Sequence, residues 1–217
     1  IISGAFGLFK KDVVIACGGY DSSTMGEDME LVVKMHEFCL ANELPYRIRY
    51  ATGAICWTQV PERMKDLCTQ RRRWHLGLFQ SMMRHRGLFA NLRYGPVSLI
   101  SYVYFLLYEL FSPYIELFGV LTMILAFCVD LINIPFMVLF YLIYAVFGSV
   151  LSLTSFFSRI QTIDLKISVS DSLKAVLLCL FEVTCLRFVM AFVRVTAFRG
   201  YKKNRMQWGM IERQKFD

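Results

Sequence analysis

Apolar residues follow two patterns along this chain of 217 residues. From residue 97 onward they form four long runs, at about residues 97–111, 114–129, 134–157 and 173–198. The third run contains no charged residue and, as a helix, is long enough to cross about 30 Å of hydrocarbon. Before residue 96 the apolar positions are interspersed with charged ones. The pattern predicts a water-facing part followed by about four transmembrane helices.

Basic residues set the expected orientation of these helices. They lie before Pro96 and return after residue 198, whereas residues 158–172 balance two basic against two acidic side chains. Because positively charged loops stay in the cytoplasm, both ends of the membrane region should be cytoplasmic and the number of crossings should be even. We expect four crossings. Two is the alternative, since Ser112-Pro113 divides the first two runs and could make them a shallow hairpin.

The water-facing part alternates between strand and helix signals. Residues 1–9 are typical of a strand, and residues 10–17 predict a short helix that Gly18-Gly19 ends. Apolar residues at helical spacing begin directly after Glu27 and Asp28, which places both carboxylates at a helix N-terminus. Residues 46–57 indicate one or two strands, and Pro61 opens another helix. The predicted class is therefore α/β with membrane helices.

A stripe of Trp74, Leu78 and Met82, surrounded by arginines, follows in residues 70–95. It predicts an amphipathic helix in the membrane interface. The alternative is a helix of the folded domain with solvated arginines. The expected organisation is a folded domain at residues 1–69, this interfacial helix at 70–95, a transmembrane region at 96–198 and a basic cytoplasmic tail at 199–217.

Composition agrees with a membrane protein. Hydrophobic residues make up 56% of the chain, which is high for an ordinary soluble domain. The net charge of +7 is compatible with nucleic-acid binding, but the basic residues flank apolar runs and do not decorate a soluble face. We therefore expect a phospholipid membrane as a partner, and no nucleic acid.

Four charged residues inside the apolar runs need an explanation. Glu109 and Glu116 are seven residues apart, as are Arg187 and Arg194, so each pair shares one helix face. One interpretation is a polar lining for a sugar path, and the other is ion pairing between helices. In a four-crossing arrangement, depth opposes the pairing, because the glutamates would lie near the outer surface and Arg194 near the inner one.

Five short motifs occur in a fixed order before the membrane runs. They are Ser3-Gly4-Ala5, Gly18-Gly19-Tyr20-Asp21, Gly26-Glu27-Asp28, Thr58-Gln59-Val60-Pro61 and Gln70-Arg71-Arg72-Arg73-Trp74. The ordered set resembles the C-terminal part of the family 2 membrane glycosyltransferases, such as the cellulose, hyaluronan and poly-N-acetylglucosamine synthases. The resemblance implies that residues 1–69 are the C-terminal half of a GT-A-like domain. It also implies a multi-pass protein of the bacterial inner membrane with its catalytic part in the cytoplasm.

The resemblance assigns a role to each site residue. Asp28 matches the catalytic base, and its carboxylate suits the removal of a proton from an acceptor hydroxyl. Gln70 and Arg73 match positions that line the donor diphosphate, and Trp74 matches the residue that stacks on the acceptor sugar. Interfacial anchoring is the alternative role for Trp74. Glu27, with Ser3 and Gly4, is expected among the remaining substrate-binding residues.

The upstream aspartate and the D-x-D segment of that family do not occur in this chain. In the family they hold the nucleotide and a divalent cation, Mg²⁺ or Mn²⁺, so we expect these ligands in a missing N-terminal half or a partner subunit. The expected function is inverting transfer of a sugar from a nucleotide-sugar donor, such as a UDP-sugar, to a glycan or lipid-linked acceptor. The alternative is a non-catalytic membrane subunit, or a degenerate or split half, of a polysaccharide synthase assembly.

Overall fold

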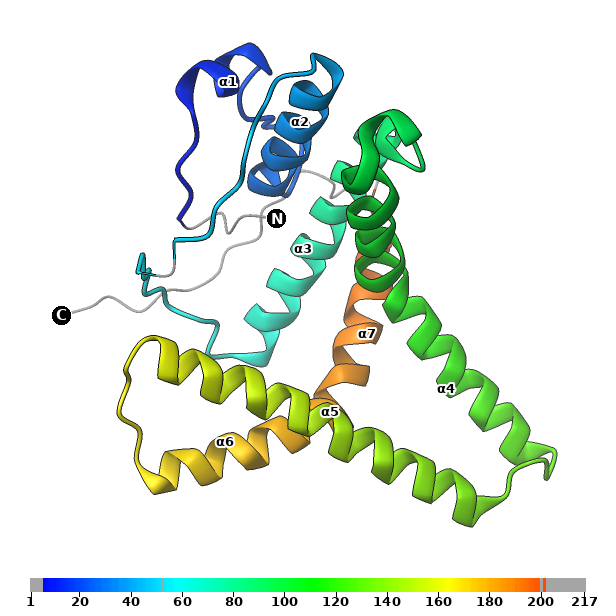
Figure 1. Cartoon of the computed structure of the whole chain (residues 1–217). Coiled ribbons are helices and arrows are strands. Elements are labelled where there is room, and N and C mark those ends of the chain that lie inside the picture. Colours follow the sequence, from blue (N-terminus) through cyan, green and yellow to red (C-terminus); the bar gives the residue numbers. More distant parts are fainter. Residues whose placement is uncertain (1–5, 52, 200, 202–217) are drawn as a thin grey trace. The chain divides into compact units, whose positions relative to one another are not determined.

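The computed structural model describes residues 6–51, 53–199 and 201 (Figure 1). These residues divide into two compact units. The first takes the described residues of Ile1–Ala51, Cys56–Pro113 and Val193–Asp217. The second takes those of Thr52–Ile55 and Tyr114–Phe192. Each unit is described by itself.

The first unit begins with two helices joined through a glycine turn. α1 (Lys11–Ala16) is followed by Gly18 and Gly19, whose φ angles of 89° and 68° lie in the left-handed region. The predicted glycine stop is therefore confirmed. α2 (Glu27–Ala41) begins at Glu27, which confirms that the two carboxylates lie at a helix N-terminus.

The next helix of this unit, α3 (Met64–Arg84), carries the motif from Gln70 to Trp74 and begins before it. Leu78 and Met82 of the predicted apolar stripe are buried on α3. Both belong to a cluster with Leu88, Tyr102 and Leu110, against which residues of α2 pack. This part of the stripe therefore faces protein, as in a helix of a folded domain, and interfacial membrane binding stays a prediction. Two short turns follow, η1 (Arg86–Leu88) and η2 (Leu92–Tyr94).

The expected strands are not found. Among residues 6–51, 53–199 and 201, the structure contains helices, turns and irregular segments, with no strand. Residues 46–51 and 53–57 lack ladder hydrogen bonds, although their composition is typical of a strand. A strand requires a partner strand to satisfy its main-chain groups, and composition alone does not supply one. The α/β class is thus unconfirmed.

The membrane region contains three helices, and not four, that are long and apolar enough to cross a bilayer in the described part of the chain. They are Val97–Cys128, Ile134–Thr162 and Val169–Phe198. The first joins η3 (Val97–Tyr102), η4 (Phe105–Phe111) and α4 (Ser112–Cys128); the second is α5 (Ile134–Thr162). The third joins α6 (Val169–Phe181), η5 (Glu182–Leu186), α7 (Arg187–Val195) and η6 (Thr196–Phe198).

The expectation that Ser112-Pro113 separates two segments is wrong, because the helix continues through Pro113. Proline has no N–H to donate to the preceding turn. Pro113 is the second residue of α4, directly after the π-helical segment η4, and the Glu109 carbonyl in that segment accepts a hydrogen bond from the Arg194 guanidinium. Other groups can thus satisfy main-chain carbonyls near a proline, and the helix need not end. The number of membrane crossings stays a prediction.

In the second unit, α5 and α6 lie side by side (Figure 1). Gly148 of α5 approaches Val183 so closely that a Cβ there would lie 2.9 Å from a methyl group. The Tyr141 hydroxyl donates to the Thr184 carbonyl at 3.0 Å. Small residues and hydrogen bonds of this kind are typical of helices packed in a membrane.

Glu109, Glu116, Arg187 and Arg194, the four charged residues considered in the sequence analysis, form ion pairs. In the second unit, Arg187 donates to Oε1 of Glu116 from Nη2 at 2.7 Å and from Nε at 3.0 Å. In the first unit, Nη2 of Arg194 lies 3.7 Å from Oε2 of Glu109. Ion pairing, which the depth argument opposed, is the interpretation that the contacts bear out.

Candidate active site

The Glu27-Asp28 pair lies in the first turn of α2. Glu27 and Asp28 are both half-buried, and Oδ1 of Asp28 accepts from the main-chain N–H of Met29 at 2.8 Å. Unpaired N–H groups and the helix dipole favour negative charge at a helix N-terminus. Both carboxylates therefore lie at the positive end of the α2 dipole.

A glycine-to-glycine contact fixes this end of α2 against α3. A Cβ built on Gly77 would lie 2.8 Å from the nitrogen and 2.9 Å from the Cα of Gly26. Both atoms belong to the backbone, so no side chain at residue 77 fits without movement of the chain. Next to this contact, the main-chain N–H of Met25 donates to Oε1 of Gln80 at 2.7 Å. Met25 and Gly26 are thus held against the α3 turn from Gly77 to Gln80.

The Gln70, Arg73 and Trp74 side chains lie on the same face of α3 as Gly77. Their spacings from Gly77 are seven, four and three residues, which are helical neighbours on one face. The turn that carries Arg73 and Trp74 begins about 6 Å along the axis before Gly77, at about 1.5 Å per residue.

Further contacts give the direction of α2 on α3. The chain touches Gly77 at Gly26 and His85 at Glu30. The two helices therefore run in the same direction, and the N-terminus of α2 is directed toward the earlier turns of α3. Asp28 lies in the first turn of α2, between these two contacts. Sequence analysis assigned Asp28, Arg73 and Trp74 to one site, and that assignment stays a prediction.

Trp74 is available for contact with a ligand, since 47% of its surface is exposed. The Arg71 guanidinium lies 4.7 Å from the centre of the indole ring, where it makes a cation–π contact. Arg71 and Arg72 are exposed, as expected for groups outside the catalytic set, whereas Arg73 is half-buried. Arg73 is therefore the arginine of this motif that the fold directs into the protein.

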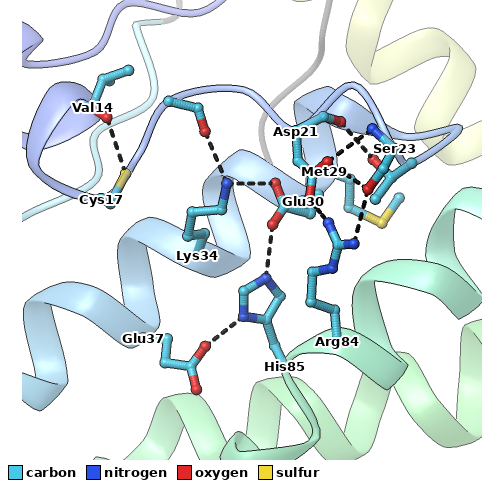
Figure 2. A network of polar contacts seen from close by, with 12 residues as sticks. Val14, Cys17, Asp21, Ser23, Met29, Glu30, Lys34, Glu37, Arg84 and His85 are labelled. Carbon is cyan, nitrogen blue, oxygen red and sulfur yellow. Dashed lines mark hydrogen bonds and ion pairs between the residues drawn. The ribbon is translucent and has the colours of Figure 1, made fainter.

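Farther along the two helices, a buried polar network holds them together (Figure 2). Glu30, which has no exposed surface, accepts from Lys34 at 3.1 Å and contacts Nε2 of His85 at 3.0 Å. The other ring nitrogen of His85 contacts Glu37, and Lys34 also donates to the Gly19 carbonyl at 2.8 Å. Arg84 pairs with Asp21 in the turn before α2. Sequence analysis missed this network.

The network changes the pKa values of its members. Burial disfavours the charge of His85, but the hydrogen bonds to Glu30 and Glu37 outweigh it, so the pKa of His85 lies above its ordinary value of 6.5. Burial likewise disfavours the charge of Glu30, but His85 and Lys34 outweigh it and lower its pKa below 4.5.

The signs of these shifts define a pH range of greatest stability. The His85 contribution is complete below its unfolded pKa of 6.5 and is lost as the pH rises through its folded pKa. The Glu30 contribution is complete above its unfolded pKa of 4.5 and is lost as the pH falls through its folded pKa. Both are complete between pH 4.5 and 6.5.

His75, directly after Trp74, is a second residue that sequence analysis missed. It is buried, and Nδ1 accepts from Nε of Arg194 at 3.4 Å. An arginine N–H can only donate, so this ring nitrogen is unprotonated. Burial and the positive charge of Arg194 lower the pKa of His75 to about 4, and the imidazole is neutral at pH 7. The sequence feature that could have indicated this contact is Arg194, because a charged residue in an apolar run requires a polar partner.

One predicted part of the site lies outside the described residues, and the cation ligands were expected outside this chain. Ser3 and Gly4 lie outside the described residues. No group of three or more His, Cys, Asp or Glu side chains suited to a metal ion occurs in the described part of the chain. These residues therefore do not fit a divalent cation site, and the Mg²⁺ or Mn²⁺ expected for the full enzyme stays a prediction.

The comparisons with known proteins agree with the motifs. Residues 1–151 match the family described as glycosyl transferase family group 2, and the chain belongs to this family. It is similar to the poly-beta-1,6-N-acetyl-D-glucosamine synthase of Staphylococcus aureus (strain COL), with 39% identity over 83 residues. The synthase of Staphylococcus epidermidis (strain ATCC 35984) is 37% identical over 83 residues. Each match covers 38% of this chain and 19% of the relative, so the chain matches about a fifth of their length. No solved structure matches.

Proposed function

We propose that this chain supplies the acceptor-side half of an inverting glycosyltransferase at the bacterial inner membrane. The reaction would transfer a sugar from a nucleotide-sugar donor, most simply a UDP-sugar, to a glycan or lipid-linked acceptor. Family membership supports the class of reaction. The single observation that supports the proposal is the Gly26 to Gly77 contact, in which the residue before Glu27 and Asp28 packs on α3 one turn after Arg73 and Trp74.

In this proposal Asp28 is the general base. An acceptor hydroxyl has a high pKa, so a carboxylate within hydrogen-bond reach takes its proton as the oxygen attacks the anomeric carbon. The new bond from that oxygen to carbon forms while the bond from carbon to the diphosphate oxygen breaks. A single displacement inverts the anomeric centre, with no covalent intermediate on the protein. The exposed indole of Trp74 would stack on the acceptor ring.

The nucleotide diphosphate leaves with additional negative charge. Arg73 can hold phosphate oxygens through two parallel N–H bonds and offset this charge, with Gln70 donating from the preceding turn. We propose that the nucleotide and a divalent cation are bound by residues outside this chain, because the D-x-D segment does not occur in it. No step in this account depends on the cation.

The test uses the complete gene product that contains this chain, in membranes, with a panel of radiolabelled UDP-sugars. UDP-N-acetylglucosamine comes first, because the similar staphylococcal proteins are poly-beta-1,6-N-acetyl-D-glucosamine synthases. The expected result is incorporation of one sugar into a glycan or lipid product, together with release of UDP. Absence of transfer from every donor, in a protein that still binds a UDP-sugar, would contradict the proposal and favour a non-catalytic subunit.

A further inference from the structure

The end of the last apolar helix, η6, packs against α3 at Leu76, two residues after Trp74. Ala197 of η6 is buried in a cluster with Met25 and Leu76, with Phe198 and Tyr201 packed against it. The Phe198 ring lies edge-on to His75, with ring centres 5.7 Å apart. All of these residues lie in the first unit. The family match covers residues 1–151, so it assigns no role in the site to Arg194, Ala197, Phe198 or Tyr201.

Tyr201 links this helix end to the Glu27-Asp28 turn. Nε2 of Gln80 donates to the Tyr201 hydroxyl at 3.3 Å, while Oε1 of the same side chain accepts from the N–H of Met25 at 2.7 Å. The Gln80 side-chain amide on α3 therefore bonds both to Met25, just before Gly26, and to Tyr201, just after the last apolar helix. The contact lies one turn beyond Gly77.

Arg194 connects the last apolar helix to α3 at His75, the residue after Trp74. The half-buried guanidinium donates from Nε to His75 and from Nη2 to the Glu109 carbonyl, and it lies 3.7 Å from the Glu109 carboxylate. Its planar fork fixes the direction of several N–H groups at once, so these partners are held in one geometry. The Glu109 carbonyl belongs to the helical segment η4, so it is an acceptor fixed in the helix.

We propose that Arg194 is a positioning residue for the acceptor: by holding His75 and the Glu109 turn together, it fixes the adjacent Trp74 in the orientation that stacks on the acceptor sugar. The proposal rests on the proposed function. It differs from a merely structural role for Arg194, in which loss of the guanidinium lowers the amount of folded protein without changing the affinity for one substrate selectively. Acceptor and donor affinities therefore have to be measured separately.

The experiment compares Arg194→Leu, Arg194→Lys and Arg199→Leu in the complete membrane enzyme. The probes are UDP-N-acetylglucosamine and a β-1,6-linked N-acetylglucosamine oligosaccharide. Arg199 is the matched control, because it is an exposed arginine of the same segment. Since a displacement of about 1 Å can cost about 10²-fold, we expect Arg194→Leu to raise the acceptor KM by about 10-fold or more and to leave the donor KM nearly unchanged. Arg194→Lys keeps the charge without the fork and should be intermediate.

A double-mutant cycle tests whether Arg194 acts through His75. If it does, Arg194→Leu should have little further effect on the acceptor KM in a His75→Ala background. Additive effects, equal changes in the acceptor and donor KM, or values equal to those of Arg199→Leu would each overturn the proposal. Arg194→Lys keeps the test decisive if the leucine variant does not fold.

Hydrogen exchange separates this inference from the proposed function. In Arg194→Leu, the amides of residues 70–77 should exchange faster than in Arg199→Leu, because the turn has lost its support. Unchanged exchange would overturn the positioning role even if sugar transfer is observed. Absence of transfer by the unaltered enzyme would contradict the proposed function, whether or not exchange changes.

Discussion

Gly77→Ala tests the contact that brings the two motifs together. The new Cβ would lie 2.8 Å from the nitrogen of Gly26, whereas ordinary contact begins at 3.4 Å, so the backbone must retreat by 0.6 Å to restore ordinary contact. Overpacking of this kind costs about 1–3 kcal/mol. Alanine recovers about 0.5–1 kcal/mol of that through its higher helix propensity. The net loss of stability should therefore be small, about 0–2.5 kcal/mol.

The effect on sugar transfer should be larger than the effect on stability. Asp28 lies two residues after Gly26. A movement of Gly26 away from α3 therefore also moves the proposed base away from the helix that carries Arg73 and Trp74. Because about 1 Å of misplacement can cost about 10²-fold, we expect kcat/KM to fall by about 10- to 100-fold.

The assay measures initial rates of transfer in membranes, normalised to the amount of folded protein. Gly119→Ala is the matched control, because it makes the same substitution within a helix and nothing lies within 4 Å of the new Cβ. It should leave the rate unchanged. Equal rates for Gly77→Ala and Gly119→Ala would refute the view that close helix contact aligns the site.

Three further predictions concern the acceptor, the buried network and the membrane topology. Trp74→Ala should raise the acceptor KM more than the donor KM, relative to Trp57→Ala at another exposed tryptophan; equal changes would favour membrane anchoring. Thermal stability in detergent should fall as the pH rises from about 6 to about 9, because His85 loses its proton, and His85→Gln should remove this slope. A retained slope would assign the titration to another group. A single cysteine at Asp130, in a chain without its native cysteines, should react with an impermeant maleimide from outside the cell, because Val97–Cys128 is one helix; protection there would restore the four-crossing arrangement.

Local features of the fold could be predicted because their causes lie within a few residues. Gly18 and Gly19 end α1 with left-handed backbone, which few other residues adopt at little cost. Apolar spacing after Asp28 indicated where α2 begins. Long apolar runs predicted helices long and apolar enough to cross a bilayer, although the described residues contain three of them where about four were expected.

Features that depend on distant partners could not be predicted in the same way. Ser112-Pro113 favours a break because proline removes a helical bond, but the helix continues through it, and Arg194, 81 residues after Pro113, donates to the Glu109 carbonyl before it. The depth argument against ion pairs depended on that break and fails without it. Gly77 and Gly26 are separated by 51 residues, and neither glycine shows in the sequence that the other is its neighbour.

The most direct measurement is the initial rate of sugar transfer by Asp28→Asn in the complete enzyme, beside Asp12→Asn at an exposed carboxylate of α1. General base catalysis contributes about 10²–10⁴-fold, so the transfer rate of Asp28→Asn should fall by about that factor while the variant still binds the UDP-sugar. Asp12→Asn should keep the rate of the unaltered enzyme. Transfer by Asp28→Asn at the rate of Asp12→Asn would contradict the account.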